Sequence, residues 1–169
     1  LDASKNIYVG DWLTRNIKKI TPSGSVTIFA GSGARESTDG QGVSASFSSV
    51  DYIEFDSQGN LLVADGNVVR VISPEANVTT LNIGVNPLGG QSLGAFNVVA
   101  IALDIDGNIL TTSAIEGKVL KTFNNGTTTL VAGGAQVPSV NDTKLNSTFK
   151  SLQSVAVKGD GTVYFTEFG

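Results

Sequence analysis

The chain of 169 residues contains no cysteine, no histidine and no methionine. Without cysteine it can form neither disulfides nor thiolate metal sites. Without histidine it lacks the commonest general base and the commonest nitrogen ligand for metals. We therefore assign no catalytic residue and no confident metal site from the sequence. Because methionine is missing even at position 1, we expect the sequence to start inside a longer product or after processing.

Positive charge is also scarce. Eleven Lys and Arg stand against fifteen Asp and Glu, which gives a formal net charge of −4. Nucleic-acid binding normally needs a clustered basic surface, so we expect no nucleic-acid partner. No apolar run approaches the length needed to cross a bilayer, so no membrane span is expected. The 40% of apolar and 15% of charged residues are typical of a globular chain, and the 20 glycines predict many tight turns.

A hairpin pattern recurs along the chain. Each copy has a short apolar run, a turn of Asp, Ser, Gly and Asn, and a second apolar run, which is the pattern of two antiparallel strands. The copies are 53–65, 101–111, 155–165 and a truncated 1–9. A second hairpin follows in three of them, at 17–31, 68–81 and 118–133. Four short strands repeated about every 50 residues predict a β-propeller blade.

The order of these phrases resembles the NHL repeat family, and the resemblance covers nearly the whole chain. The phrases that match closely are 8–11, 17–20, 22–24, 29–33, 39–42 and 45–47. The family usually has an Arg just before its basic strand, where this chain has Asn16, Val68 and Lys118. The resemblance implies an all-β fold, a β-propeller of four-stranded antiparallel blades, and the departures make the repeats degenerate.

The expected blades occupy approximately 1–31, 47–81 and 96–133, with a partial blade at 149–169. A Phe lies before each later blade, and we expect Phe47, Phe96 and Phe149 to fill the joints between neighbouring blades. NHL-like propellers usually have about six blades, so about three and a half leave open blade edges. Either this stretch is part of a longer chain, which we favour, or copies of the chain assemble through those edges.

Three acids share one position, directly after the second strand of a unit: Asp11, Asp65 and Glu167, with Ser113 in the remaining unit. Their repetition favours a structural role, in which they bond loop amides or pair with the next strand. The functional alternative is a ring of acids that holds a cation such as Ca²⁺. The run 104–108 also resembles a calcium loop, but a turn capped by its own Asp and Asn fits it better.

The loops between the second and third strands, and those between blades, are expected to emerge on one common face of a propeller. That face is the rim most often used for ligands. The candidate binding residues on it are Trp12, Arg15, Arg35, Glu36, Asn67 and Glu116. Trp12 is either an exposed contact for a partner or an anchor between blades.

Four Asn-x-Ser/Thr sequences predict N-glycosylation if the protein is secreted by a eukaryotic cell. They begin at Asn77, Asn125, Asn141 and Asn146. All four fall in or beside expected turns and loops, where glycans would be accessible. The alternative is that they are ordinary polar loop residues.

Two functions remain open from the sequence. The first is an extracellular or cell-surface module for binding, adhesion or assembly, with a protein or carbohydrate partner or self-assembly through open edges. The alternative is a propeller enzyme of the lyase or lactonase type, with calcium as a candidate cofactor and catalytic residues outside this stretch. The fold by itself does not decide between them.

Overall fold

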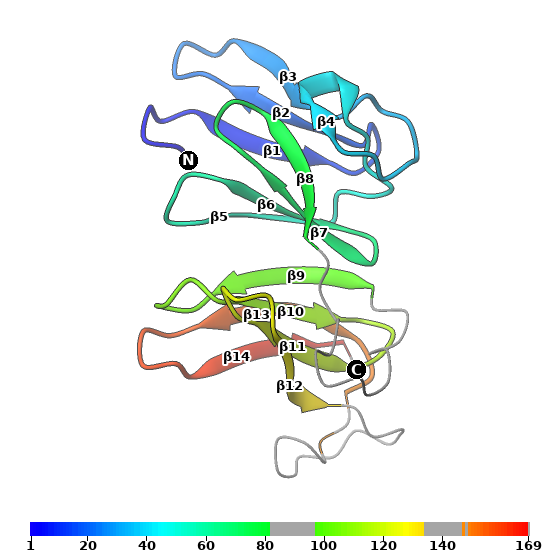
Figure 1. The fold of residues 1–169 in the computed structure, drawn as a ribbon, viewed down its shortest axis with the longest axis vertical. Helices are drawn as coiled ribbons and strands as arrows, with labels where there is room; N and C mark the ends of the chain where they lie inside the picture. Colours follow the sequence, from blue (N-terminus) through cyan, green and yellow to red (C-terminus); the bar gives the residue numbers. More distant parts are fainter. Residues whose placement is uncertain (82–96, 134–146, 148, 169) are drawn as a thin grey trace. The chain divides into compact units, whose positions relative to one another are not determined.

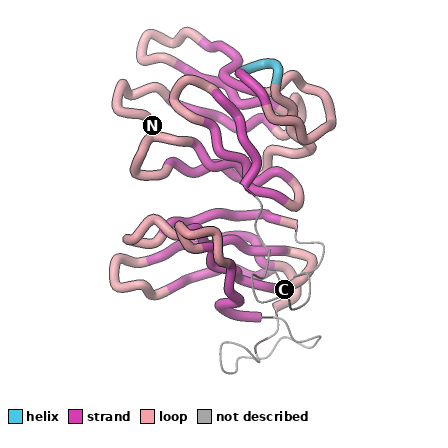
Figure 2. The backbone as a smooth tube through the Cα atoms, viewed as in Figure 1, coloured by secondary structure: helices cyan, strands magenta, loops and turns pink. Residues whose placement is uncertain are grey.

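The computed structural model describes residues 1–81, 97–133, 147 and 149–168. The chain forms two compact units, Leu1–Leu81 and Asn82–Gly169, which are described separately. Antiparallel strands and tight turns build both units, and a single short 3-10 turn, Gly42–Ser44, occurs in the described part of the first (Figures 1 and 2). The predicted fold class, all-β with four-stranded antiparallel sheets, is confirmed.

The first unit contains two sheets. One has three strands in the order β1-β2-β3, and the other has five in the order β4-β8-β7-β6-β5. The strands of the first sheet are β1 (Ile7–Asp11), β2 (Asn16–Ile20) and β3 (Val26–Ala30). Those of the second are β4 (Gly40–Gln41), β5 (Tyr52–Phe55), β6 (Leu61–Asp65), β7 (Val68–Ile72) and β8 (Asn77–Leu81).

The second unit repeats this design. A four-stranded sheet has the order β12-β11-β10-β9, and β13 pairs with β14 in a two-stranded sheet. The strands are β9 (Val98–Leu103), β10 (Ile109–Ser113), β11 (Lys118–Thr122), β12 (Thr128–Gly133), β13 (Leu152–Val157) and β14 (Val163–Glu167). The strands of all the sheets except β4 lie inside the four blade ranges expected from the sequence.

β4 was not predicted. It comes from the loop that follows β3, and Gly40 and Gln41 pair with Val78 and Asn77 at the edge of β8. The side-chain amide of Gln41 also donates a hydrogen bond to the carbonyl of Glu75. Two residues are too few for a strand pattern to be visible in the sequence. Their pairing covers an edge that would otherwise expose unpaired backbone groups.

The recurring hairpin turns share one backbone design. Asp56 N donates to Asn60 O at 2.9 Å, and Gly59 adopts a φ of +86° between them. The side chain of Asp56 accepts the amide of Asn60 at 2.8 Å, which fixes the turn locally. The same Asp–Asn pairing closes the turns at 2–6 and 104–108. The predicted turn chemistry of Asp, Gly and Asn therefore connects β5 to β6 and β9 to β10, whereas the turn at 2–6 leads into β1 with Lys5 in the place of the glycine.

The cores of the two units lie between their sheets. In the first unit Phe47 is fully buried and packs with Ile17, Leu61 and Val63 in one cluster. In the second, Phe149 lies edge-on to Phe165, with ring centroids 4.6 Å apart. Both side chains thus join neighbouring sheets, in the role that the sequence predicted for the repeated Phe. Phe96 lies outside the described residues.

Backbone strain can be tested in the turns between β2 and β3 and between β7 and β8. Gly24 and Ala76 occupy the same place in these two turns, with φ of +86° and +67°. An L-residue in this left-handed region costs about 1–2 kcal/mol, partly offset by the extra chain entropy that glycine loses on folding. We expect Ala76→Gly to raise the free energy of unfolding by roughly 0.5–1 kcal/mol in urea titrations.

Gly24→Ala is the matched reverse change, because a Cβ at Gly24 would meet no atom within 4 Å. Only the backbone conformation then decides the outcome, and we expect a loss of similar size. An unchanged urea midpoint for both variants would contradict the account of these turns.

Candidate functional site

The loop between β1 and β2 presents two large apolar side chains to solvent. Trp12 and Leu13 are 70% and 68% exposed. The loop itself is held from within, because Asp11 Oδ1 accepts the amides of Leu13 and Thr14 at 3.1 and 3.0 Å. Lys18 Nζ lies 2.6 Å from Asp11 Oδ2, and this hydrogen-bonded ion pair holds the pKa of Asp11 well below its usual range. The sequence indicated Trp12 as a candidate, whereas the exposure of its neighbour Leu13 was missed.

Other predicted rim residues of the first unit lie at the same end of its sheets. The backbone at Gly31 and Gly33 passes close to Arg15 and Thr14, because a Cβ on either glycine would come within 3.3 Å of a carbonyl there. The loop after β3 then carries the exposed Arg35 and Glu36. Exposed Asn67 sits in the turn between β6 and β7.

Glu116 belongs to the second unit and is described apart from the other rim residues, so a common rim stays a prediction. It lies in the turn between β10 and β11, half-buried, with its carboxylate 2.8 Å from Lys118 Nζ. Arg15 has a φ of +50°, in a region that non-glycine residues rarely adopt, as do Lys5 and Ala76 of the same unit. Strain of this kind is found where the surrounding structure fixes a loop, often at binding sites.

Asp65, a candidate cation ligand, is fully buried and faces a buried cation of the protein itself. Its Oδ2 lies 2.9 Å from Nη1 of Arg70, and neither side chain is exposed. Oδ1 accepts the hydroxyl of Ser48 at 2.6 Å and the amide of Ser49 at 2.9 Å. The geometry is that of the structural role weighed from the sequence, pairing with the next strand and bonding loop amides.

Arg70 extends this network into the loop between β3 and β5. Nη1 donates to the carbonyl of Ser46 at 3.0 Å, and Nη2 lies 2.8 Å from Asp39 Oδ1. The guanidinium carbon sits 5.4 Å from the ring centre of Phe47, within cation–π range. Arg70 and Asp39 were not singled out from the sequence, because residues 31 positions apart carry no local signal of pairing.

The positions of Asp65 and Arg70 recur in the other sheets with different side chains. By strand register, Arg70 lies opposite Val63. Lys18 lies opposite Val9, and Leu120 lies opposite Thr111, at the same step of their own sheets. In the second unit Ser113 and Leu120 replace the acid and the base, and both are buried. Glu167 accepts the backbone amide of Lys150. At the shared acid position, Asp11, Asp65 and Glu167 thus bond groups of the protein itself, and the cation alternative stays a prediction.

Calcium binding stays a prediction. Across residues 1–81, 97–133, 147 and 149–168, no three acidic side chains are grouped so that they could hold a metal ion. Asp104 Oδ1 accepts the amides of Asp106 and Asn108 at 3.0 and 2.9 Å. Burial raises the pKa of Asp104, but the bonds from Lys121 and Asn108 outweigh it and bring the pKa to about 2. These bonds are those of a turn capped by its own Asp and Asn, which was the alternative to a calcium loop at 104–108.

Two of the predicted glycosylation sites can be placed. Asn77 begins β8, and Asn125 lies in the turn before β12; both residues are exposed. Asn77 lies at the end of its sheet opposite to Asn67, because β7 and β8 run from Val68 to Ile72 and back. A glycan on Asn77 would therefore leave uncovered the end of the sheet that carries Asn67. Asn141 and Asn146 lie outside the described residues.

No protein-family model matches the chain, and no curated protein matches it by sequence. Solved structures do match. One is a protein of unknown function from Bacteroides thetaiotaomicron, with a TM-score of 0.71 and 20% identity, over 99% of this chain and 43% of that one. Another is virginiamycin B lyase from Staphylococcus aureus, with a TM-score of 0.64 and 18% identity, over 96% and 45%. A gluconolactonase-like protein gives 0.64 and 11%, over 99% and 55%.

Two further matches are extracellular or ligand-binding proteins. The extracellular domain of a hybrid two component system from Bacteroides thetaiotaomicron has a TM-score of 0.60 and 16% identity, over 97% of this chain and 19% of that one. An auxiliary nutrient binding protein from Bacteroides ovatus has a TM-score of 0.57 and 12% identity, over 97% and 33%. The chain therefore spans about half the length, or less, of the proteins it matches.

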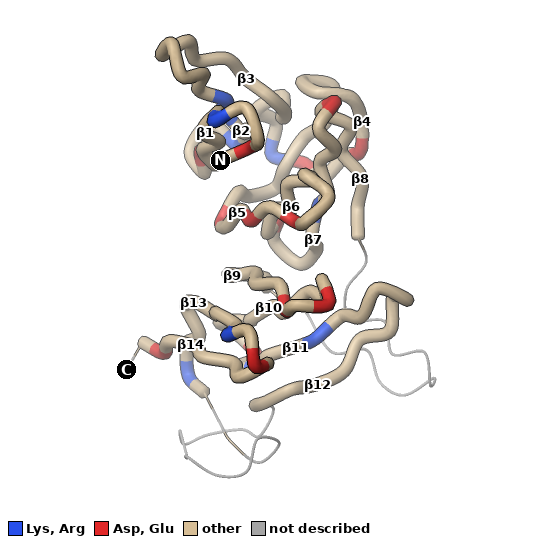
Figure 3. The backbone as a smooth tube through the Cα atoms, turned by 90° about the vertical axis from the view of Figure 1, so that its left-hand side faces the viewer, with Lys and Arg blue, Asp and Glu red and all other residues tan. Residues whose placement is uncertain are grey.

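These likenesses define the class of the protein. At such low identity they show the fold alone, which is that of part of a β-propeller. Membership of a propeller family, and of the NHL repeat family in particular, stays a prediction. No helix long and apolar enough to cross a membrane occurs in the described ranges. Within each unit, basic and acidic residues are interspersed along the chain (Figure 3).

The buried ion pair predicts a strong coupling between its two positions. Arg70→Leu alone leaves Asp65 buried without a counter-charge, and Asp65→Ser alone leaves the buried Arg70 with Asp39, which is 53% exposed, as its counter-charge. Removing one partner of a buried pair costs about 3–5 kcal/mol. We expect the double variant, which copies Ser113 and Leu120, to lose clearly less than the sum of the single losses in urea unfolding. Additive losses would show that the two charges do not depend on each other.

Proposed function

We propose that this chain belongs to an extracellular binding module, built on an NHL-like propeller, that recognises a protein or carbohydrate partner through Trp12. The observation that carries the proposal is a large apolar side chain left exposed on a loop whose backbone is fixed. Tryptophan is enriched among the hot-spot residues that carry most of the binding energy of an interface. Leu13 beside it enlarges the apolar contact to two adjacent side chains.

The polar surroundings suit such a contact. Asp11 and Lys18 fix the loop before any partner arrives, so little conformational entropy is lost on binding. Arg15 and Arg35 take part in no ion pair with other described residues. Their guanidinium groups can donate hydrogen bonds to carboxylates or hydroxyl groups, and Glu36 can accept them. An indole face with flanking donors and acceptors fits either a sugar ring or a protein surface.

An extracellular or cell-surface location accords with this role. Asn77 and Asn125 are exposed glycosylation sequences, and extracellular and nutrient-binding propellers are among the structures with this fold. The lyase and gluconolactonase-like matches support the enzyme alternative only through the shared fold, and fold alone does not imply function.

The binding proposal can be tested on arrays of immobilised oligosaccharides and of extracellular protein domains. Trp12 is the single tryptophan of the chain, so its intrinsic fluorescence reports directly on the loop. We expect a bound partner to shift that emission and Trp12→Ala to weaken affinity at least tenfold, as truncation of a hot-spot residue does. Ile105→Ala is the control, because Ile105 is 80% exposed in a turn of the other unit.

Equal affinity of Trp12→Ala and Ile105→Ala for the same partner would remove Trp12 from the binding surface. A partner that Ile105→Ala alone loses would move the site to the second unit.

An extracellular location predicts that N-linked glycans add to the mass of the protein. Expressed through a eukaryotic secretory pathway, the chain should carry N-linked glycans that an endoglycosidase removes. Asn77→Gln and Asn125→Gln should each reduce the glycosylated mass by one glycan, because both asparagines are exposed. The measurement is intact mass before and after enzymatic deglycosylation. A single unmodified mass from a secreted sample would contradict the glycoprotein part of the proposal.

A further inference from the structure

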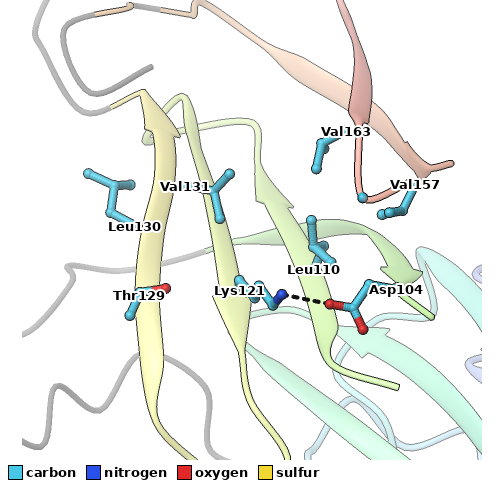
Figure 4. A pocket seen from close by; sticks show the side chains of 9 residues that line it. Asp104, Leu110, Lys121, Thr129, Leu130, Val131, Val157 and Val163 are labelled. Atoms are coloured by element: carbon cyan, nitrogen blue, oxygen red, sulfur yellow. Dashed lines mark ion pairs between the residues drawn. The ribbon is translucent and has the colours of Figure 1, made fainter. Parts of the chain in front are cut away.

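The second unit contains a hollow of about 300 Å³ beside an ion pair. Leu110, Val131, Val157 and Val163 form apolar parts of its wall, and Asp104 and Lys121 form a polar part (Figure 4). Lys121 Nζ lies 2.6 Å from Asp104 Oδ2, with 27% and 8% of the two side chains exposed. The volume is within the range that small molecules occupy in proteins.

Strand register identifies the equivalent place in the first unit. Leu110 pairs with Lys121, and Tyr8 pairs with Lys19, at the same step of the second and third strands. Val131 and Phe29 are both the extra residue at a bulge that precedes a paired alanine. Val157 and Phe55 both end the first strand of the next sheet, opposite Val163 and Leu61.

In the first unit three aromatic rings fill that place. The ring of Tyr8 lies edge-on to Phe29, with centroids 5.0 Å apart, and edge-on to Phe55 at 5.2 Å. The second unit has the smaller Leu110, Val131 and Val157 at these three positions. The hollow thus lies where the first unit has three rings and the second unit has aliphatic side chains.

The polar partner of the missing ring has been retained. The hydroxyl of Tyr8 donates to Asp2 Oδ2 at 3.1 Å, and Lys19 Nζ lies 5.7 Å from the centre of the Tyr8 ring. Asp104 stands where Asp2 stands, because each closes the same Asp–Asn turn. Lys121 Nζ lies 2.6 Å from Asp104 Oδ2, the oxygen equivalent to the one that accepts the tyrosine hydroxyl in the first unit. An ion pair therefore borders the hollow, and no tyrosine supplies the ring.

We propose that the hollow of the second unit binds a small phenol, whose ring takes the place of the missing aromatic rings and whose hydroxyl donates to Asp104. The apolar walls formed by Leu110, Val131, Val157 and Val163 favour a flat aromatic molecule, because dispersion contacts replace empty space. A phenol hydroxyl can share Asp104 Oδ2 with Lys121 Nζ, which lies 2.6 Å from it, whereas a hydrocarbon ring adds no hydrogen bond there. The site lies in the second unit and does not depend on the Trp12 proposal.

The test uses 4-methylphenol as the probe, titrated into the whole chain by isothermal calorimetry and by protein NMR. We expect one saturable site, with NMR shifts at Leu110, Val131 and Val157. Leu110→Tyr restores the residue of the first unit and should fill the hollow, so the dissociation constant should rise at least tenfold. Val157→Phe should act in the same direction and serves as a second filling variant. Circular dichroism establishes that each variant remains folded.

Three results decide the proposal. Absence of saturable binding to the unaltered chain overturns it, and so does unchanged affinity in a folded Leu110→Tyr variant. Toluene, which has the same ring without the hydroxyl, should bind at least tenfold more weakly than 4-methylphenol. Equal affinity for toluene would overturn the assignment of Asp104 as the acceptor. Tyr8→Leu is the reciprocal variant, and it should create a second, weaker site in the first unit.

Discussion

The buried pair of Arg70 and Asp65 is the interaction on which the first unit depends. Two fully buried charges are unfavourable unless each is paired and hydrogen-bonded. Here the remaining bonds come from the loop between β3 and β5, through Ser46, Ser48 and Asp39. That loop must therefore lie over the sheet, and in doing so it brings Phe47 into the core and Arg35 to the rim. Charge satisfaction and apolar packing specify the same loop path.

Degeneracy among the repeats has a physical meaning in this light. Backbone register and turn design are kept, while the side chains at equivalent positions change together. The acid–base pair is surface-accessible at Asp11 and Lys18, buried at Asp65 and Arg70, and replaced by Ser113 and Leu120. The aromatic cluster of the first unit becomes aliphatic in the second. Each unit thus keeps the strand framework and differs in what its interior can hold.

The sequence predicted the strands and their turns because those depend on nearby residues. Alternating apolar runs around Asp56 and Asn60, or Asp104 and Asn108, contain the information that closes a hairpin. The sequence did not predict β4 or the network of Arg70, because both depend on residues brought together only by the fold. At the candidate site it indicated Trp12 but missed Leu13, whose exposure depends on how Asp11 holds the loop. Glu116 was grouped with the rim by repeat position alone.

Because the Trp12 side chain is isolated from the core, chemical damage to the indole is separated from loss of the native fold. A buried tryptophan that is photo-oxidised disturbs the packing around it, and the damaged molecule unfolds. Trp12 is 70% exposed, and the bonds that fix its loop are made by Asp11, Lys18 and backbone amides. Light or oxidants could therefore modify the indole in a molecule that keeps its native fold. Such molecules would accumulate in aged samples as folded protein with an altered indole.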